Sequence, residues 1–205
     1  MIQSIDVGPM LRFLPIAVVP LIIFGLFIIC FILFQDSRIE SSGLAVYGQV
    51  PEFTLIDSNA KEFSSNQLTG KIWVADFIFT KCAGPCLTMS RQMAEFHKNF
   101  QKDNRVRMIS VSVDPERDSP QVLSKYALLY SANTDIWHFL TGSSEAIHQL
   151  AFKGFKVGSI EDSINHSTYF VLVDQKLQIR GYYDGVDQEK MNQLSRDIAY
   201  LLEEI

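Results

Sequence analysis

The fold is decided by the stretch Ile72-Trp73-Val74-Ala75-Asp76-Phe77-Ile78-Phe79, which two residues separate from Cys82-Ala83-Gly84-Pro85-Cys86. The first part is an almost continuous apolar run, which predicts a central strand covered on both faces of its sheet. Pro85 suits the first position of a helix, because the N–H that proline lacks would be an unpaired donor there. We therefore predict a strand, a loop that carries cysteine, and a helix over about 86–100.

Strand and helix patterns alternate along the rest of the chain after residue 49. Further strands are predicted at 53–56, 61–63, 106–113, 136–140, 168–173 and 177–183, and further helices at 120–130, 143–152 and 188–202. This order predicts an α/β fold whose sheet is parallel and then antiparallel, with helices on both faces. It is typical of the thioredoxin-like class.

An uncharged stretch at 13–34 precedes this domain. Twenty-two residues of helix span roughly 33 Å, which is enough to cross a hydrocarbon core of about 30 Å. A cleaved signal peptide is disfavoured, because its apolar run is typically about 7–15 residues and no small-residue cleavage site follows here. A lipoprotein signal ending at Cys30 is disfavoured for lack of small residues before it. We predict a tail at 1–12, one transmembrane helix at 13–34, a polar linker at 35–49 and a thioredoxin-like domain at 50–205.

Charge excludes one class of partner and suggests a location. The net charge is −5 and no basic run is present, so nucleic-acid binding is not expected. The positive-inside signal around the span is weak. Because the N-terminus has no room for an arginine-rich transit peptide, we expect a bacterial inner membrane with the domain in the periplasm, in preference to a mitochondrial inner membrane facing the intermembrane space.

The cysteines carry the chemistry. Cys30 lies in the predicted span, which leaves Cys82 and Cys86 as one close pair in the domain. The start of a helix favours an anion, so a cysteine there is expected to have a lowered pKa. Such a pair can form a disulfide or hold a soft metal ion. The motif has three intervening residues where thioredoxin has two, and spacing alone leaves redox and metal chemistry both open.

The loop before the predicted strand at 168 favours a metal. Thioredoxin-like oxidoreductases carry a cis-proline there, but the last of the seven prolines in this chain is Pro120. The loop contains Asn165-His166-Ser167 instead. Two thiolates and an imidazole suit copper, whereas a structural zinc site would need a fourth ligand. The predicted metal ligands are therefore Cys82, Cys86 and His166.

The segment Asp114-Pro115-Glu116-Arg117-Asp118-Ser119-Pro120 resembles the D-P-x-R-D-[TS]-P signature of the Sco/SenC family of copper chaperones. The C-x-x-x-C motif, the His-Ser before a strand and the N-terminal anchor also match, and the resemblance covers about 46–204. It implies a thioredoxin fold that binds Cu(I) or Cu(II) through Cys82, Cys86 and His166. It also implies delivery of copper to, or reduction of thiols in, the CuA centre of cytochrome c oxidase subunit II or another cuproprotein, with an upstream copper donor.

Three positions depart from the family pattern. Ala83 and Leu87 stand where the family usually has proline after each cysteine, and Asn165 replaces a common acidic residue before the histidine. Loss of that negative charge is expected to alter copper affinity or redox preference. The predicted ligands themselves are intact.

The remaining residues with possible chemistry receive structural interpretations. His97 is predicted to be a solvated surface residue, and His138 and His148 to be packed or edge histidines. Core packing is predicted for Met89, Met93, Trp73 and Trp137, and a tight loop for Asp114, Arg117 and Asp118.

Two other functions stay in view beside a copper chaperone that is not a turnover enzyme. A membrane-bound thiol:disulfide oxidoreductase would need only the redox pair Cys82 and Cys86, with His166 as a bystander. A peroxidase-like sensor would use a sulfenic acid at one cysteine, but the threonine arrangement expected of peroxiredoxins is absent.

Overall fold

The computed structural model describes residues 43–157 and 167–204. The predicted tail and anchor, Cys30, Asn165 and His166 lie outside the described residues. The chain divides into two units, Met1–Gly43 and Leu44–Ile205, and all described helices and strands lie in the second, a compact unit. Within the described ranges, no helix has both the length and the apolar character needed to cross a membrane.

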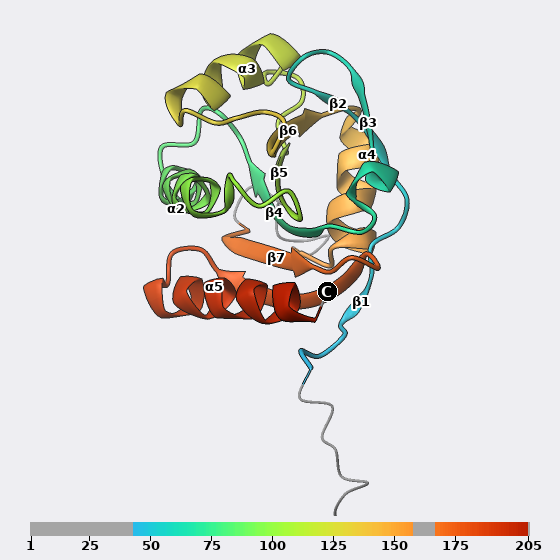
Figure 1. The fold of residues 1–205 in the computed structure, drawn as a ribbon. Coiled ribbons are helices and arrows are strands. Elements are labelled where there is room, and N and C mark those ends of the chain that lie inside the picture. Colours follow the sequence, from blue (N-terminus) through green and yellow to red (C-terminus); the bar gives the residue numbers. More distant parts are fainter. Residues whose placement is uncertain (1–42, 158–166, 205) are drawn as a thin grey trace, which may run out of the picture. The chain divides into compact units, whose positions relative to one another are not determined.

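Eight strands of this unit form one sheet, in the order β1-β8-β7-β4-β5-β6-β2-β3 (Figure 1). Their bounds are Gly48–Gln49 (β1), Thr54–Asp57 (β2), Glu62–Ser64 (β3), Ile72–Ile78 (β4), Val106–Ser112 (β5), Trp137–Thr141 (β6), Tyr169–Val173 (β7) and Gln178–Asp184 (β8). Strands β4, β5 and β6 run parallel to one another, and the other pairings are antiparallel. The predicted mixed sheet is confirmed.

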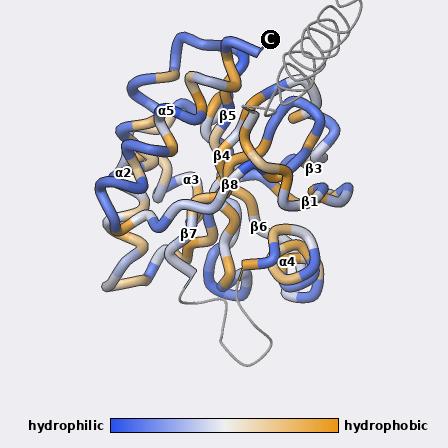
Figure 2. The backbone as a smooth tube through the Cα atoms, turned by 90° about the horizontal axis from the view of Figure 1, so that it is seen from below, coloured by the Kyte–Doolittle hydropathy of each residue, from blue (hydrophilic) through white to orange (hydrophobic). Residues whose placement is uncertain are grey.

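Strand β4 is the centre of the sheet, as its apolar run predicted. All seven of its residues are buried. It pairs with β5 along its whole length, from Ile72 opposite Val106 to Ile78 opposite Ser112. Figure 2 shows the hydrophobic residues concentrated in these inner strands. The strand end that precedes the cysteines is therefore fixed by its pairing with β5, while β7 pairs with the first half of β4.

Helices cover both faces of the sheet (Figure 1). Helices α2 (Pro85–Phe100), α3 (Pro120–Leu129) and α5 (Gln188–Glu203) pack on one face, and α4 (Ser144–Gln149) packs on the other with the π-helix η3 (Leu150–Gly154). A short 3₁₀ helix, η2 (Ser65–Leu68), connects β3 to β4. Helix α5 buries its predicted apolar face, made of Met191, Leu194, Ile198 and Leu201.

The predicted helix starts are confirmed. Pro85 and Pro120 occupy first-turn positions of α2 and α3. Ser119 caps α3, since its Oγ accepts a hydrogen bond from the N–H of Val122 at 3.4 Å. Local sequence signals therefore fix where the helix after the cysteines begins.

The helix predicted at 143–152 changes form part of the way along. Helix α4 ends at Gln149 and η3 follows, with the N–H of Phe155 donating to the carbonyl of Leu150 at 2.8 Å. In an α-helix, residues five apart point about 140° away from each other. The wider turn lets both Leu150 and Phe155 face the core, where Phe155 meets Trp73 edge to face with 5.7 Å between ring centroids.

Residues just before β2 also belong to this unit. Strand β1 pairs with β8, and Arg180 of β8 donates through Nη2 to the carbonyl of Leu44 at 2.6 Å. The same guanidinium forms an ion pair with Asp174, at 2.8 Å between Nη1 and Oδ2. The stretch 44–49, at the end of the predicted linker, is thus held against the sheet edge.

Candidate metal centre

The cysteine pair lies where β4 ends and α2 begins. The N–H of Cys82 donates to the carbonyl of Phe79 at 3.1 Å, which closes a tight turn after the strand. Cys86 is the second residue of α2, after Pro85. Both are free thiols, with exposed fractions of 9% for Cys82 and 4% for Cys86. The sequence-predicted pair is therefore together, reduced and largely shielded from solvent.

The pKa values of the two thiols are shifted in opposite directions. Burial acts to raise the pKa of Cys82, but hydrogen bonds from the Cys86 thiol and from the N–H groups of Gly84 and Cys86 lower it below its ordinary value. Burial, and next the hydrogen bond to Cys82, raise the pKa of Cys86 to about 12. The predicted lowering is confirmed for Cys82 and wrong for Cys86, because desolvation outweighs the helix start there.

A buried carboxyl group that the sequence analysis did not single out acts on the pair through its charge. Asp76 of β4 is fully buried, and its Oδ1 accepts a hydrogen bond from Ser110 Oγ at 2.6 Å. The indole N–H of Trp137 donates to the same Ser110 oxygen at 2.9 Å. Burial raises the pKa of Asp76 to about 7, against the effect of the Ser110 hydrogen bond, and the charge of Asp76 acts to raise the pKa of Cys86. The signal for this group in the sequence was that Asp76 is a single charged residue in an otherwise apolar strand.

Asp76 makes stability depend on pH. Its folded pKa of about 7 lies above the ordinary 3.8, so between these values the native state holds a proton that the unfolded chain has lost. The free energy of unfolding should therefore fall as pH rises from 4 to 8, by up to about 4 kcal/mol from this group. Asp76→Asn should remove that slope, as measured by denaturant unfolding at several pH values.

Ser110→Ala provides the matched control for this test. It keeps the carboxyl group but removes the hydrogen bond that lowers its pKa. The pH dependence should then persist and extend to higher pH. An Asp76→Asn protein with an unchanged slope would contradict the assignment of the pH dependence to this side chain.

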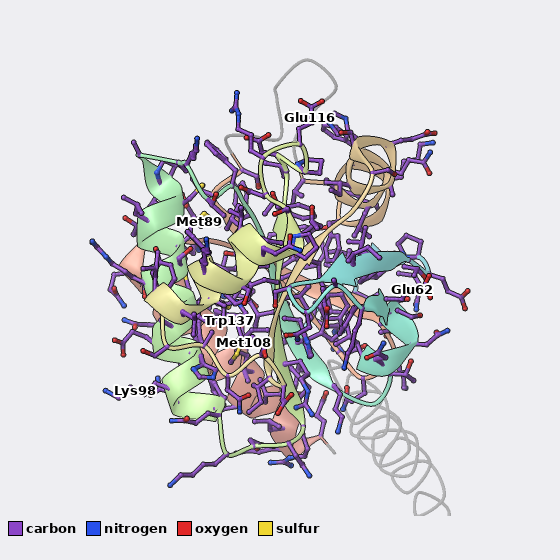
Figure 3. All side chains as sticks on the ribbon, turned by 90° about the horizontal axis from the view of Figure 1, so that it is seen from above. Glu62, Met89, Lys98, Met108, Glu116 and Trp137 are labelled. Atoms are coloured by element: carbon purple, nitrogen blue, oxygen red, sulfur yellow. The ribbon has the colours of Figure 1, made fainter. Side chains whose placement is uncertain are left out.

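The other sequence-predicted residues are mostly structural, as expected. Met89, Met93, Trp73 and Trp137 are fully buried, and Figure 3 shows Met89, Met108 and Trp137 inside the molecule while Lys98 points outward from α2. Asp114 pairs with Arg117 at 3.1 Å between Oδ2 and Nη1, in the predicted tight loop. No three His, Cys, Asp or Glu side chains cluster as a metal site within 43–157 and 167–204.

The histidines of the described part differ from one another. His138 packs on Phe63 with 4.6 Å between ring centroids, and burial lowers its pKa to about 4. His148 is exposed on α4 and its ring lies edge to face with Phe152. The predicted solvated position of His97 is wrong. Its side chain is buried, and its Nε2 accepts a hydrogen bond from the N–H of Asn133 at 3.1 Å, because the end of α2 packs against the β6 layer.

The sheet order, the helices on both faces and a dithiol between β4 and α2 define the class, a thioredoxin-like α/β protein with a cysteine pair. Within that class the SCO1/SenC family model matches residues 45–203. The chain belongs to the SCO1/SenC family. This confirms the family resemblance drawn from the sequence motifs.

Individual relatives agree with this placement. The SCO1 protein homolog of Bacillus subtilis (strain 168) is 36% identical over 156 residues, which cover 73% of this chain and 81% of that protein. A structure of BsSco, described as a member of the Sco family of cytochrome c oxidase assembly proteins with a disulfide switch, has a TM-score of 0.68 at 34% identity, covering 77% of this chain and 96% of BsSco.

A second similar structure is that of Bradyrhizobium japonicum ScoI, which was solved with copper bound. It has a TM-score of 0.60 at 23% identity and covers 72% of this chain and 98% of ScoI. At this identity the likeness is one of fold.

Proposed function

We propose that this chain is a membrane-anchored copper-binding chaperone. It delivers copper to a CuA centre during cytochrome c oxidase assembly, or reduces the thiols there, and it acts as a carrier and not as a turnover enzyme. The observation that carries the proposal is the reduced, hydrogen-bonded pair Cys82 and Cys86 in a SCO1/SenC fold. Two sulfur donors at one strand end suit a soft ion such as Cu(I). The assembly role named for BsSco supports the same assignment.

The proposed copper ligands are Cys82, Cys86 and His166. Strand β7 lies next to β4 and runs antiparallel to it, with Val171 opposite Ala75. The chain therefore enters β7, at Tyr169, along the same sheet edge where β4 ends and the cysteine loop begins. Residue 166 is three positions before Tyr169, within roughly 10 Å of chain, so this register supports His166 as the third ligand.

Copper titration of the purified full chain in detergent tests the ligand set. The wild type should bind one copper ion, and His166→Ala should weaken binding by more than the 10–100-fold loss typical of outer-shell partners. His148→Ala removes an exposed imidazole and should leave copper affinity unchanged. Unchanged affinity in His166→Ala would remove His166 from the ligand set.

A thiol:disulfide oxidoreductase is the second candidate, and the opposite pKa shifts of the two cysteines favour it. A Cys82 thiolate would attack a partner disulfide, forming a mixed disulfide and releasing one partner thiol. Cys86 would then lose its proton and displace the second partner thiol, so two electrons and two protons pass to the partner. This candidate would be favoured if the His166→Ala protein exchanges thiols normally and binds copper as tightly as the wild type does.

We also propose the domain arrangement and location expected from the sequence. Residues 13–34 act as a single inner-membrane anchor. Of the linker expected at 35–49, the part at 44–49 is held against β8, so 35–43 link the anchor to the compact unit. The thioredoxin-like domain faces the periplasm, where an upstream donor supplies copper. Deleting 1–34 should move the protein from the membrane to the soluble fraction. Cys30→Ser should leave it membrane-bound, and its release would indicate a lipid on Cys30 instead.

A cellular test separates assembly from other roles. Deleting the gene should weaken the spectrum and activity of the host's CuA-type oxidase, and added copper should restore them in part. A normal oxidase at low copper would contradict the assembly role.

A further inference from the structure

A buried carboxylate connects the cysteine loop to the loop that opens α3. Asp118 has an exposed fraction of 1%. Its Oδ1 accepts from Thr80 Oγ1 at 2.5 Å, and its Oδ2 accepts from the Thr80 N–H at 3.0 Å and from Ser112 Oγ at 2.6 Å. Of the ion pairs among the described residues, none includes Asp118. Within 43–157 and 167–204, the donors to its oxygens are all neutral.

These hydrogen bonds fix a point close to the cysteines. Thr80 lies two residues before Cys82, and it is anchored through both its backbone N–H and its hydroxyl group. Ser112 is the last residue of β5, the strand that pairs with β4. The N–H of Asp118 also donates to the carbonyl of Asp114 at 2.9 Å. The carboxylate therefore joins the cysteine loop to a rigid strand end.

The arrangement is stronger than a tight loop needs. The Asp114–Arg117 ion pair and the backbone hydrogen bonds already close the turn between β5 and α3. Of the three side-chain contacts of Asp118, only the one from Ser112 lies within that turn, and the other two end on Thr80. A buried acceptor of three hydrogen bonds holds its donors firmly, because each of them would lose its partner on moving.

We propose that Asp118 is a positioning residue that holds the Thr80–Cys82 segment in place, so that the Cys82 sulfur stays within reach of Cys86. The proposal rests on the proposed function in taking Cys82 and Cys86 as the working pair. Its consequence is a high effective concentration of one thiol at the other, which favours any state that needs both sulfurs together.

Disulfide formation measures that effective concentration without copper. The Cys82 and Cys86 thiols lose two electrons and two protons as their S–S bond forms, and glutathione disulfide takes up both and becomes two molecules of glutathione. The equilibrium constant of this exchange falls when the two thiols are held together less well. Asparagine at 118 would remove the negative charge that strengthens the hydrogen bonds from Thr80 and Ser112, and the Thr80 hydroxyl would have to change from donor to acceptor.

The experiment equilibrates the full chain in detergent, freed of copper by a chelator, with glutathione buffers and counts free thiols by alkylation and mass spectrometry. Asp118→Asn should lower the equilibrium constant about tenfold, and Thr80→Val, which removes the hydroxyl contact, about fivefold. Thr80→Ser keeps both contacts and should stay within about twofold of wild type. Arg117→Ala breaks the exposed ion pair of the same loop and should also leave the constant unchanged.

Several results would overturn the proposal. Asp118→Asn protein with lower thermal stability and an unchanged equilibrium constant would show that Asp118 only stabilises the fold. A higher constant, or equal shifts in Thr80→Ser and Thr80→Val, would exclude the positioning role. If Asp118→Asn does not fold, the two Thr80 variants decide. Because copper is absent, a chain that binds no copper would contradict the proposed function and leave this test intact.

Discussion

In the reduced protein at pH 7, iodoacetamide should modify Cys82 at least about 30-fold faster than Cys86. The pKa of Cys86 is raised to about 12 from an ordinary 9.0, which lowers its thiolate fraction at pH 7 by about 1,000-fold. The greater nucleophilicity of a more basic thiolate offsets about half of this on a logarithmic scale. The lowered pKa of Cys82 and its greater exposure widen the difference.

Peptide mass spectrometry of a timed alkylation series measures the two rates in the same molecule. Guanidinium-unfolded protein is the control, since both cysteines should then react at similar rates. Equal rates in the folded protein, or faster reaction of Cys86, would contradict the assignment of Cys82 as the attacking thiol.

Arg180→Ala should lower the free energy of unfolding by about 3–5 kcal/mol. The side chains of Arg180 and Asp174 are 12% and 2% exposed, so the substitution leaves a buried carboxylate without its cation. It also removes the donor to the carbonyl of Leu44, which holds the first residues of the compact unit against β8. Urea unfolding followed by circular dichroism would give the difference.

Arg117→Ala is the matched control for the ion-pair prediction. Its partner distance of 3.1 Å is similar, but the Arg117 side chain is 67% exposed. Exposed pairs contribute about 0–1 kcal/mol, so little loss is expected. Comparable losses in the two variants would show that burial does not set the strength of the Arg180 pair.

The sequence predicted most of the architecture, because its strands and helices carry strong local signals. The apolar run of β4, the prolines that open α2 and α3, and the periodic face of α5 each determine an element without help from distant residues. The π-helix η3 and strand β1 depend on tertiary contacts instead. Phe155 must reach Trp73, and Gly48–Gln49 must meet β8, and neither partner can be read from local periodicity.

The sequence predicted which cysteines form the site better than it predicted their pKa values. The spacing of Cys82 and Cys86 gave the pair and its place at a helix start. The pKa of Cys86 is raised first by burial and by its hydrogen bond to Cys82, and less by the charge of Asp76, which acts on it only once the sheet has folded. His97 was misplaced for the same reason, since its contact with Asn133 joins α2 to a distant turn. The pattern of residue types shows what lies along one helix or strand. The desolvation of a side chain depends instead on the other elements that pack over it.

The lengths of the outermost strands affect whether copies of this protein associate with one another. At one edge of the sheet β1 has two residues, and at the other β3 has three. An unpaired strand edge is a template on which another chain can add, and a template this short offers few free hydrogen-bonding groups. Association of copies of this domain through β1 or β3 is therefore expected to be weak.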